Sequence, residues 1–202
     1  MSLAAPRAHT EASGPAHPHP DEEAAAWVGG RAVAVSELER RLAMLRASDR
    51  ACVLPAPDTR EARQLRRWMA QVMVVEQLCV DELARRGVDW PADEPPGMPS
   101  RTDAVALGSI AAAAWSGHPA VRQAALEVTR DVRLGAAAVE SAHRFGQTED
   151  GGLTWSLDEL LASARLDAFS RWLARVQHER VTLVPGLEHP GDSGQPDNLH
   201  RH

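Results

Sequence analysis

An apolar stripe between residues 60 and 86 constrains the fold of this chain more than any other feature. Its members lie three or four positions apart, the spacing that places side chains on one face of an α-helix. They are Leu65, Trp68, Met69, Val72, Val75, Cys79 and Leu83. Asp58 or Thr59 can cap the start of this helix, and Gly87 followed by Val88 is typical of a helix end. At 1.5 Å per residue the helix would be roughly 40 Å long, so the sequence predicts a mainly α domain.

One or two small strand pairings are predicted at the ends of this domain. Residues 26–35 have the pattern of two short strands around a tight turn at Gly29 and Gly30. A further alternating segment lies at 180–184, and its pairing with the second early strand would close the two ends of the domain together. The residues expected to pair are Val33 and Val35 with Val181 and Leu183.

Helix starts and proline residues divide the rest of the sequence. Ser36 with Glu39 and Ser156 with Glu159 each place a hydroxyl three residues before a glutamate, the pattern of a capping box. The predicted helices begin at residue 36 and cover 102–115, 119–143 with a bend near Gly135, and 156–178, with a proline-containing linker at 88–100. The predicted organisation is a disordered arm at 1–23, a helical domain at 24–186 and a polar tail at 187–202.

Composition excludes several function classes. The chain has 202 residues and a formal net charge of −6, so it lacks the basic surface that a dedicated nucleic-acid-binding protein uses. It contains no lysine, which excludes lysine Schiff bases, pyridoxal-phosphate anchoring and P-loop phosphate binding. No apolar run is long enough to cross a membrane, and residues 1–23 lack the apolar core of a secretory signal. We therefore expect a cytoplasmic protein.

The last 15 residues concentrate side chains that bind divalent metals. Imidazoles and carboxylates are the ligand types for zinc, nickel, copper or non-haem iron. The candidate ligands are His189, Asp192, Asp197, His200 and His202, with Glu188 nearby. No histidine among them has another candidate ligand at helical i,i+4 spacing, so a solvated or docked tail without a bound ion is the other interpretation. A possible divalent metal is thus the one cofactor that the sequence suggests, and it is not firmly implied.

Three segments resemble the N-terminal helical domain of SurA-type chaperones. They are VGGRAVAVSELERRLAMLR, REARQLRRWMAQVMVVEQLCVDELARRGV and LDAFSRWLARVQHERVTLVPG. SurA-type proteins begin with a similar strand, turn and helix, continue into a long helix with a Gly-Val cap, and return with a late helix and strand. The resemblance covers roughly residues 26–88 and 156–185 and implies a SurA-like fold with a groove for an extended peptide.

The resemblance does not extend to catalysis. The parvulin domains that perform prolyl isomerisation have no counterpart here, because the intervening sequence is Ala-rich and helical. The tail EHPGDSGQPDNLHRH also resembles small actinobacterial SurA-like proteins, some labelled malonyl transferases and found beside aromatic polyketide genes. The chain has no G-H-S-x-G nucleophile elbow, so the residues do not support that label.

Tryptophans and apolar helix positions provide the candidate binding groove. Trp68 and Trp172 lie on apolar faces that should enter the core, whereas Trp90 and Trp155 lie beside helix ends, where an indole can line a groove. The predicted groove residues are Trp68, Val72, Val75, Trp90, Trp155 and Trp172. The arginine-rich face of the long helix would suit an acidic partner such as a carrier protein, and a solvated face is the default interpretation. Its members are Arg60, Arg63, Arg66 and Arg67.

Two function hypotheses from different classes follow. The first is a non-catalytic, chaperone-like binding module that holds a peptide, a partner protein or a hydrophobic small molecule. The alternative is a small accessory enzyme of aromatic polyketide biosynthesis that uses the C-terminal His/Asp segment. Whether the protein is an enzyme is left open. Glu76 would have a raised pKa and could serve as a base if it is buried, and an exposed flank position or a pair with an arginine is the other interpretation. Cys79 is expected in the core.

Overall fold

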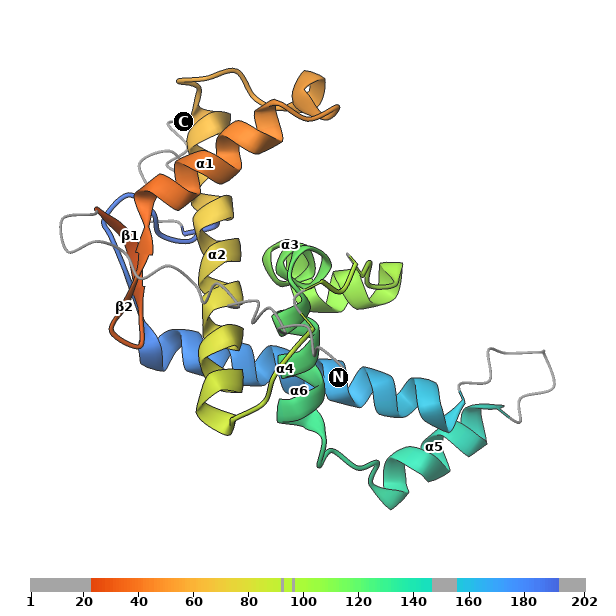
Figure 1. Ribbon diagram of the computed structural model, residues 1–202. Helices are drawn as coiled ribbons and strands as arrows, with labels where there is room; N and C mark the ends of the chain where they lie inside the picture. The colour runs from red at the N-terminus through yellow and green to blue at the C-terminus, as the bar shows by residue number, and fades with distance from the viewer. Residues whose placement is uncertain (1–22, 92, 96, 147–155, 193–202) are drawn as a thin grey trace, which may run out of the picture.

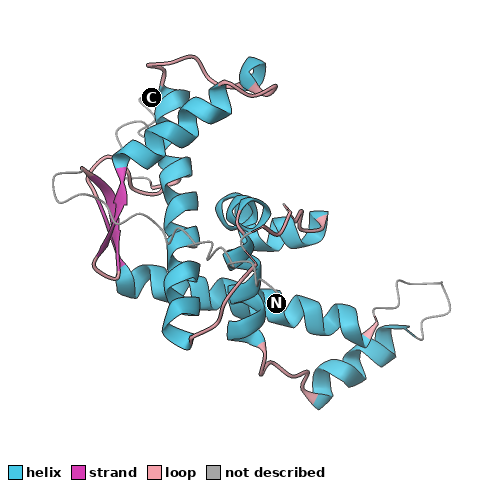
Figure 2. Cartoon of the chain, viewed as in Figure 1, coloured by secondary structure: helices cyan, strands magenta, loops and turns pink. Residues whose placement is uncertain are grey.

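The computed structural model describes residues 23–91, 93–95, 97–146 and 156–192. The predicted disordered arm, apart from Glu23, and the end of the predicted tail lie outside these residues. The described elements are β1 (Ala24–Val28), β2 (Arg31–Ala34), α1 (Val35–Arg46), the short 3-10 helix η1 (Ala51–Val53), α2 (Arg60–Arg86), α3 (Arg101–Gly117), α4 (Pro119–Thr129), α5 (Ala136–Gly146), α6 (Leu157–Arg180) and β3 (Val181–Leu183). This confirms a mainly α fold with a small sheet (Figures 1 and 2).

The long helix α2 is the centre of the fold. It contacts α1, α3, α4, α6 and the sheet, and Figure 1 shows α1 across one end of it and α6 across the other. Because helices and sheet surround it, all residues from Ala70 to Glu76 are buried, although the sequence predicts a single apolar face. The Thr59 side chain accepts a hydrogen bond from the Ala62 N–H at 3.1 Å, which confirms one of the two predicted caps.

The end of α2 is also as predicted. Gly87 adopts a left-handed conformation with φ of 66°, which a residue without a Cβ tolerates. The Val88 N–H donates to the Leu83 carbonyl at 3.0 Å and the Gly87 N–H to the Ala84 carbonyl at 3.1 Å. These two bonds form a Schellman motif, which stops the helix and turns the chain into the linker.

The sheet has a different strand order from the predicted one. Its order is β2-β1-β3, all antiparallel, so the first strand is central and the last strand pairs with it. Ala26 lies opposite both Val33 and Leu183, and Val28 lies opposite Val181. The predicted pairing of Val33 and Val35 with β3 is therefore wrong. The central position goes to β1 because its Ala26 and Val28 are fully buried, whereas β2 runs directly into α1.

Two local predictions at helix starts have opposite outcomes. The Ser156 capping box of α6 forms, with the Glu159 N–H donating to the Ser156 hydroxyl at 3.1 Å and the Ser156 N–H to the Glu159 carboxylate at 2.7 Å. The capping box predicted at Ser36 does not form, because α1 already begins at Val35 and Ala34 occupies the capping position without a side-chain acceptor. The strand β2 passes straight into the helix, which leaves no extended residue at Ser36.

The core continues from α2 into α4 and α6. Phe169 is fully buried, stacks on Trp172 at a centroid distance of 5.6 Å and meets Trp115 edge-on at 6.2 Å. Such aromatic pairs add roughly 0.5–1.5 kcal/mol each beyond the area that they bury. The predicted helix at 119–143 is two helices, since residues 130–135 separate α4 from α5. Figure 1 shows α5 and the start of α6 extending away from α2.

Candidate functional site

A break in α3 shapes the candidate site. Gly108 has φ of 76° and ψ of 163°, outside the helical region, so α3 consists of two helical parts joined at this residue. Glycine reaches a positive φ at little cost, whereas a residue with a Cβ is strained there. The sequence predicts an Ala-rich helix over these residues, without a break.

A cavity of about 390 Å³ lies beside this break. Its walls come from α2, both parts of α3, α6 and the segment after β3. The lining residues are Val75, Leu107, Gly108, Ser109, Ile110, Ala111, Ser170, Leu173, Ala174, Gln177 and His189. The volume lies in the lower part of the range of about 300–1,000 Å³ that small-molecule sites occupy, and such sites combine apolar walls with a few polar groups.

The segment after β3 is held against α2, and this places His189 at the cavity. The Arg67 Nε donates to the Gly186 carbonyl at 3.0 Å, and the Gln71 Nε2 donates to the Leu187 carbonyl at 3.1 Å. Leu187 is 5% exposed and belongs to the core. The packed part of the chain therefore continues beyond residue 186 and includes the first residue of the predicted polar tail.

The imidazole of His189 has a defined local partner. Its Nδ1 accepts a hydrogen bond from the Gly191 N–H at 3.0 Å. In the neutral ring the proton then resides on Nε2. The sequence predicts this residue as a metal ligand, but it does not predict its position at the cavity.

Ser170 also lines the cavity. The Ser170 Oγ is buried and makes no hydrogen bond within the described part of the chain. A buried hydroxyl without a partner loses the hydrogen bonds that it makes in water. Neither Ser170 nor Gln177 was predicted as a site residue, because both occur in a helix whose sequence signal is dominated by its apolar positions.

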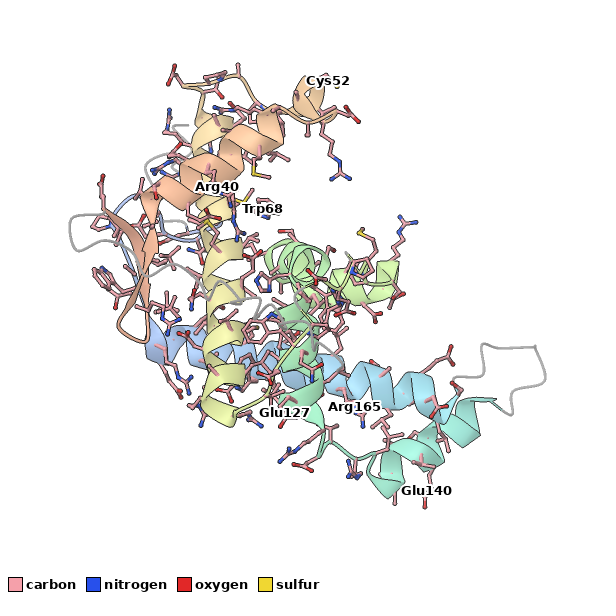
Figure 3. All side chains as sticks on the ribbon, in the orientation of Figure 1. Arg40, Cys52, Trp68, Glu127, Glu140 and Arg165 are labelled. Carbon is pink, nitrogen blue, oxygen red and sulfur yellow. The ribbon has the colours of Figure 1, made fainter. Side chains whose placement is uncertain are left out.

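The predicted groove residues do not gather in this cavity. Val75 lines it. Val72 and Trp172 are buried in the core cluster, and Trp68 and Trp90 pack against that cluster; Trp68 projects from α2 below α1 in Figure 3. Trp155 lies outside the described residues.

The structure describes two of the five predicted metal ligands. His189 and Asp192 are described, whereas Asp197, His200 and His202 lie outside the described residues. Within the described ranges, no group of three or more His, Cys, Asp or Glu side chains is arranged to hold a metal ion. Glu188 accepts a hydrogen bond from the Gly186 N–H at 2.8 Å, so it has a role in the turn that precedes His189.

The arginines of the predicted acidic-partner surface are used largely within the chain. Arg66 forms an ion pair with Glu39 at 2.7 Å. Arg67 is 6% exposed and binds the Gly186 carbonyl. Arg60 and Arg63 remain exposed at the start of α2.

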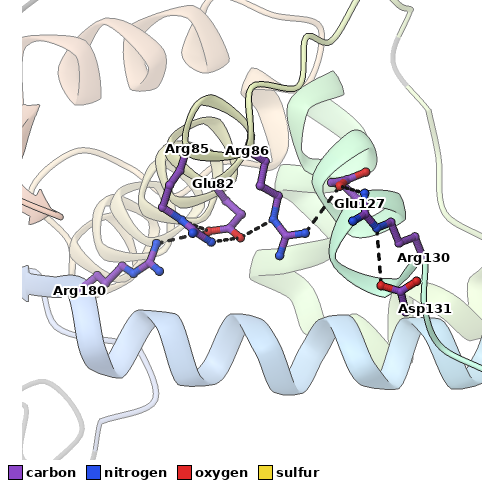
Figure 4. A network of polar contacts seen from close by, with 7 residues as sticks. All are labelled: Glu82, Arg85, Arg86, Glu127, Arg130, Asp131 and Arg180. Atoms are coloured by element: carbon purple, nitrogen blue, oxygen red, sulfur yellow. Dashed lines mark hydrogen bonds and ion pairs between the residues drawn. The ribbon is translucent and has the colours of Figure 1, made fainter.

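A charged cluster lies at the end of α2, and none of its members lines the cavity. The Glu82 carboxylate accepts hydrogen bonds from Arg85 at 2.6 Å and Arg86 at 2.7 Å and lies 3.5 Å from Arg180 (Figure 4). Arg86 also forms an ion pair with Glu127 at 3.6 Å. Burial raises the pKa of Glu82, but the arginine hydrogen bonds outweigh this effect and hold the pKa below its usual value. The cluster ties α2 to α4 and α6, which is a structural role.

Glu76 and Cys79 do not form a reactive centre. Burial raises the pKa of the Glu76 carboxyl more than its ion pair with Arg41, at 2.5 Å, lowers it. Glu76 is thus both buried and paired with an arginine, so the predicted exposed flank position is wrong. Burial also raises the pKa of the Cys79 thiol, so Cys79 is a core residue as predicted. Cys52 is exposed in η1, which lies in the segment between α1 and α2 (Figure 3).

The fold and the cavity define a mainly helical protein with a small antiparallel sheet and a small-molecule-sized cavity. A protein-family model described as a family of unknown function (DUF7158) matches residues 24–61. This segment comprises the sheet hairpin, α1, η1 and the first residues of α2. No curated protein and no solved structure matches the chain. Within the described residues, none of the helices has both the length and the apolar character of a membrane span.

Proposed function

We propose that this protein is a non-catalytic binding module that holds an apolar small molecule in the cavity between α2, α3 and α6. The observation that carries the proposal is the cavity of about 390 Å³ with a largely apolar wall. Three ionisable groups of α2 with shifted pKa values, Glu76, Glu82 and Cys79, are engaged in ion pairs or in the core. The resemblance of the sequence to SurA-type helical domains supports binding without catalysis.

Binding of N-phenyl-1-naphthylamine, a neutral apolar fluorophore, tests this function. We expect one molecule per chain and a saturable rise in fluorescence. Ala174→Trp should reduce the affinity at least tenfold, because Ala174 lines the cavity and is exposed toward it without being part of the core. Ala162→Trp is the matched control, since Ala162 is exposed on the same helix and does not line the cavity.

Two results would count against the proposal. A lack of saturable binding would show that the cavity does not take an apolar ligand. An equal effect of both tryptophan substitutions would show that the fluorophore binds elsewhere. An apolar peptide that displaces the fluorophore would indicate that the natural occupant is a peptide side chain, as the SurA resemblance implies.

The position of His189 at the cavity favours one second candidate function. In this alternative the protein is a small accessory enzyme, of aromatic polyketide biosynthesis, in which His189 supplies an acid–base group or a metal ligand from the C-terminal segment. Metal content of the purified full chain and of His189→Ala tests the metal form of this idea. Stoichiometric metal that is lost with the imidazole supports it, and metal-free protein or unchanged content contradicts it.

A further inference from the structure

The junction between α3 and α4 is closed by a histidine. α3 ends at Gly117, α4 begins at Pro119, and His118 between them is the N-cap residue of α4. Its Nδ1 accepts a hydrogen bond from the Ala120 N–H at 3.2 Å, so in the neutral ring the proton resides on Nε2. Helix caps are mostly Ser, Thr, Asp or Asn, whose side chains keep one protonation state near neutral pH. A histidine cap changes its charge in that range.

The first turn of α4 depends on this residue. Pro119 has no N–H, so the Ala120 N–H is the first of the helix that needs an acceptor. The Val121 N–H donates to the His118 carbonyl at 3.1 Å, which makes both the side chain and the backbone of His118 part of the cap. Ala120 and Val121 are fully buried, and α4 packs against α2, α3 and α6. Water therefore cannot easily replace a lost acceptor at this turn.

Arg41 of α1 is the first of two cations that act on the charge of His118. Its guanidinium forms ion pairs with Glu37 on the same helix at 2.8 Å and with the buried Glu76 of α2 at 2.5 Å. Glu76 lies next to the junction, since a Cβ at Gly117 would lie 4.0 Å from its Oε1. Because two carboxylates hold Arg41, its positive charge stays near the imidazole.

Arg122 of α4 is the second cation that acts on His118. Its Nη1 donates to the Trp115 carbonyl at 2.7 Å and its Nη2 to the Pro95 carbonyl at 3.1 Å. Its guanidinium also lies 3.4 Å from Glu94, and the side chain is 12% exposed. Arg122 therefore ties α4 to the end of α3 and to the linker before α3, and its charge is fixed in place.

These surroundings disfavour a proton on His118. Burial first, and then the charges of Arg41 and Arg122, lower the pKa of His118 below its usual value of 6.5. A proton that binds at low pH adds to Nδ1, because Nε2 already carries one, and the Ala120 N–H then loses its acceptor. The resulting cation also lies at the positive end of the α4 dipole. The stability that the neutral cap contributes is complete above the unfolded pKa of 6.5 and is lost as the pH falls toward the folded pKa.

We propose that His118 is a pH-sensitive cap, which holds α4 against the end of α3 at neutral pH and releases this junction when the imidazole is protonated. The carboxyl of Glu76, whose pKa is raised by burial, acts in the same direction. When Glu76 is protonated on acidification, less of the Arg41 charge is neutralised beside the ring. The inference does not depend on the proposed binding function, because no residue from 112 to 122 lines the cavity.

Hydrogen–deuterium exchange of the full chain, at about pH 7 and about pH 5, tests this device. Protection factors corrected for the intrinsic exchange rate are compared for residues 120–124 of α4 and residues 70–79 of α2. On acidification we expect the wild-type α4 segment to lose about threefold more protection than the α2 segment, as the loss of one helix cap implies. His118→Asn keeps a side-chain acceptor for the cap and cannot be protonated, so it should abolish this additional loss. His178→Asn is the matched control, because His178 is exposed on α6, and it should behave as the wild type does.

A pH titration of the His118 ring by NMR is the second measurement. Its midpoint should lie below 6.5 and coincide with the pH at which the start of α4 loses protection. A midpoint at or above 6.5 overturns the proposal, even if His118→Asn fails to fold. An equal loss of protection in α4 and α2 of the wild type overturns it as well. The same applies if the additional loss in α4 persists in folded His118→Asn, because another group would then be the pH sensor.

Discussion

The substitution Glu82→Gln measures what the charged cluster at the end of α2 contributes to stability. The Glu82 side chain is 1% exposed and contacts the guanidinium groups of Arg85, Arg86 and Arg180. Hydrogen bonds to charged groups contribute about 1.5–3 kcal/mol each. The three arginine side chains are 58%, 30% and 33% exposed, so water replaces part of the lost interaction. We therefore expect Glu82→Gln to lower the free energy of unfolding by about 2–3 kcal/mol at neutral pH.

The pH dependence of this loss follows from the direction of the pKa shift. The pKa of Glu82 is lower in the folded chain than its usual value of 4.5. Its stabilising contribution is complete above the unfolded pKa and is lost as the pH falls through the folded pKa. The difference in stability between wild type and Glu82→Gln should therefore shrink as the solution is acidified below about pH 4.5.

Glu76→Gln is the matched control on the same helix. The pKa of Glu76 is raised by burial in spite of its ion pair with Arg41, so the folded state does not favour the ionised form. Its contribution is present below the unfolded pKa of 4.5 and is lost as the pH rises through the folded pKa. Relative to wild type, Glu76→Gln should become more stable as the pH rises, whereas Glu82→Gln should become less stable. At neutral pH Glu76→Gln should lower the free energy of unfolding by less than about 1 kcal/mol, because Arg41 keeps its second partner, Glu37.

Urea unfolding followed by far-UV circular dichroism, at neutral pH and near pH 3.5, measures both differences. A loss of unfolding free energy in Glu82→Gln that is as large at the acidic pH as at neutral pH would contradict the lowered pKa of Glu82. The reasoning is also refuted if the two variants change with pH in the same direction, because the opposite pKa shifts would then have no effect on stability.

The remaining predictions concern the docked C-terminal segment, the start of α2 and the thiols. Leu187→Ala should lower the free energy of unfolding by about 2–5 kcal/mol in urea unfolding, because its side chain is 5% exposed in the core; a loss below about 0.5 kcal/mol would show that the segment is not docked. Thr59→Ala should cost about 1 kcal/mol in the same assay and Thr59→Ser much less, because only the alanine removes the acceptor for the Ala62 N–H. In a thiol titration with Ellman's reagent, Cys52 should react in the native protein, whereas Cys79 should react only after unfolding; rapid modification of both would contradict the buried position of Cys79.

The features that the sequence predicts correctly depend on contacts within a few residues. The cap at Thr59, the Schellman motif at Gly87 and the capping box at Ser156 each close within six residues of the chain. The strand order depends instead on contacts between β1 and β3, which are more than 150 positions apart. Alternation shows that a segment is a strand, but it does not say which neighbour the strand takes, because the backbone groups that pair are the same in every residue.

The candidate site was harder to predict for a physical reason. Strongly periodic apolar positions such as Val72 and Trp172 pack against one another, so the signal that is clearest in the sequence identifies the core. The cavity lies beside a single unusual backbone conformation at Gly108, and helical periodicity does not distinguish its lining residue Ser170 from any other polar position. His189 was singled out for its chemistry, and its place in the wall depends on the contacts of Arg67 and Gln71.

The segment that the family model matches and the residues that line the cavity are separate parts of the chain. The family model matches residues 24–61, and every described residue in the cavity wall lies beyond that segment, between Val75 and His189. The matched segment contributes the hairpin and α1, which support α2 from the side of the sheet. A protein that shares only this segment can therefore have the same hairpin and first helix together with different cavity-lining residues. Ligand specificity would then follow the residues of the cavity wall, and the family match alone does not transfer it.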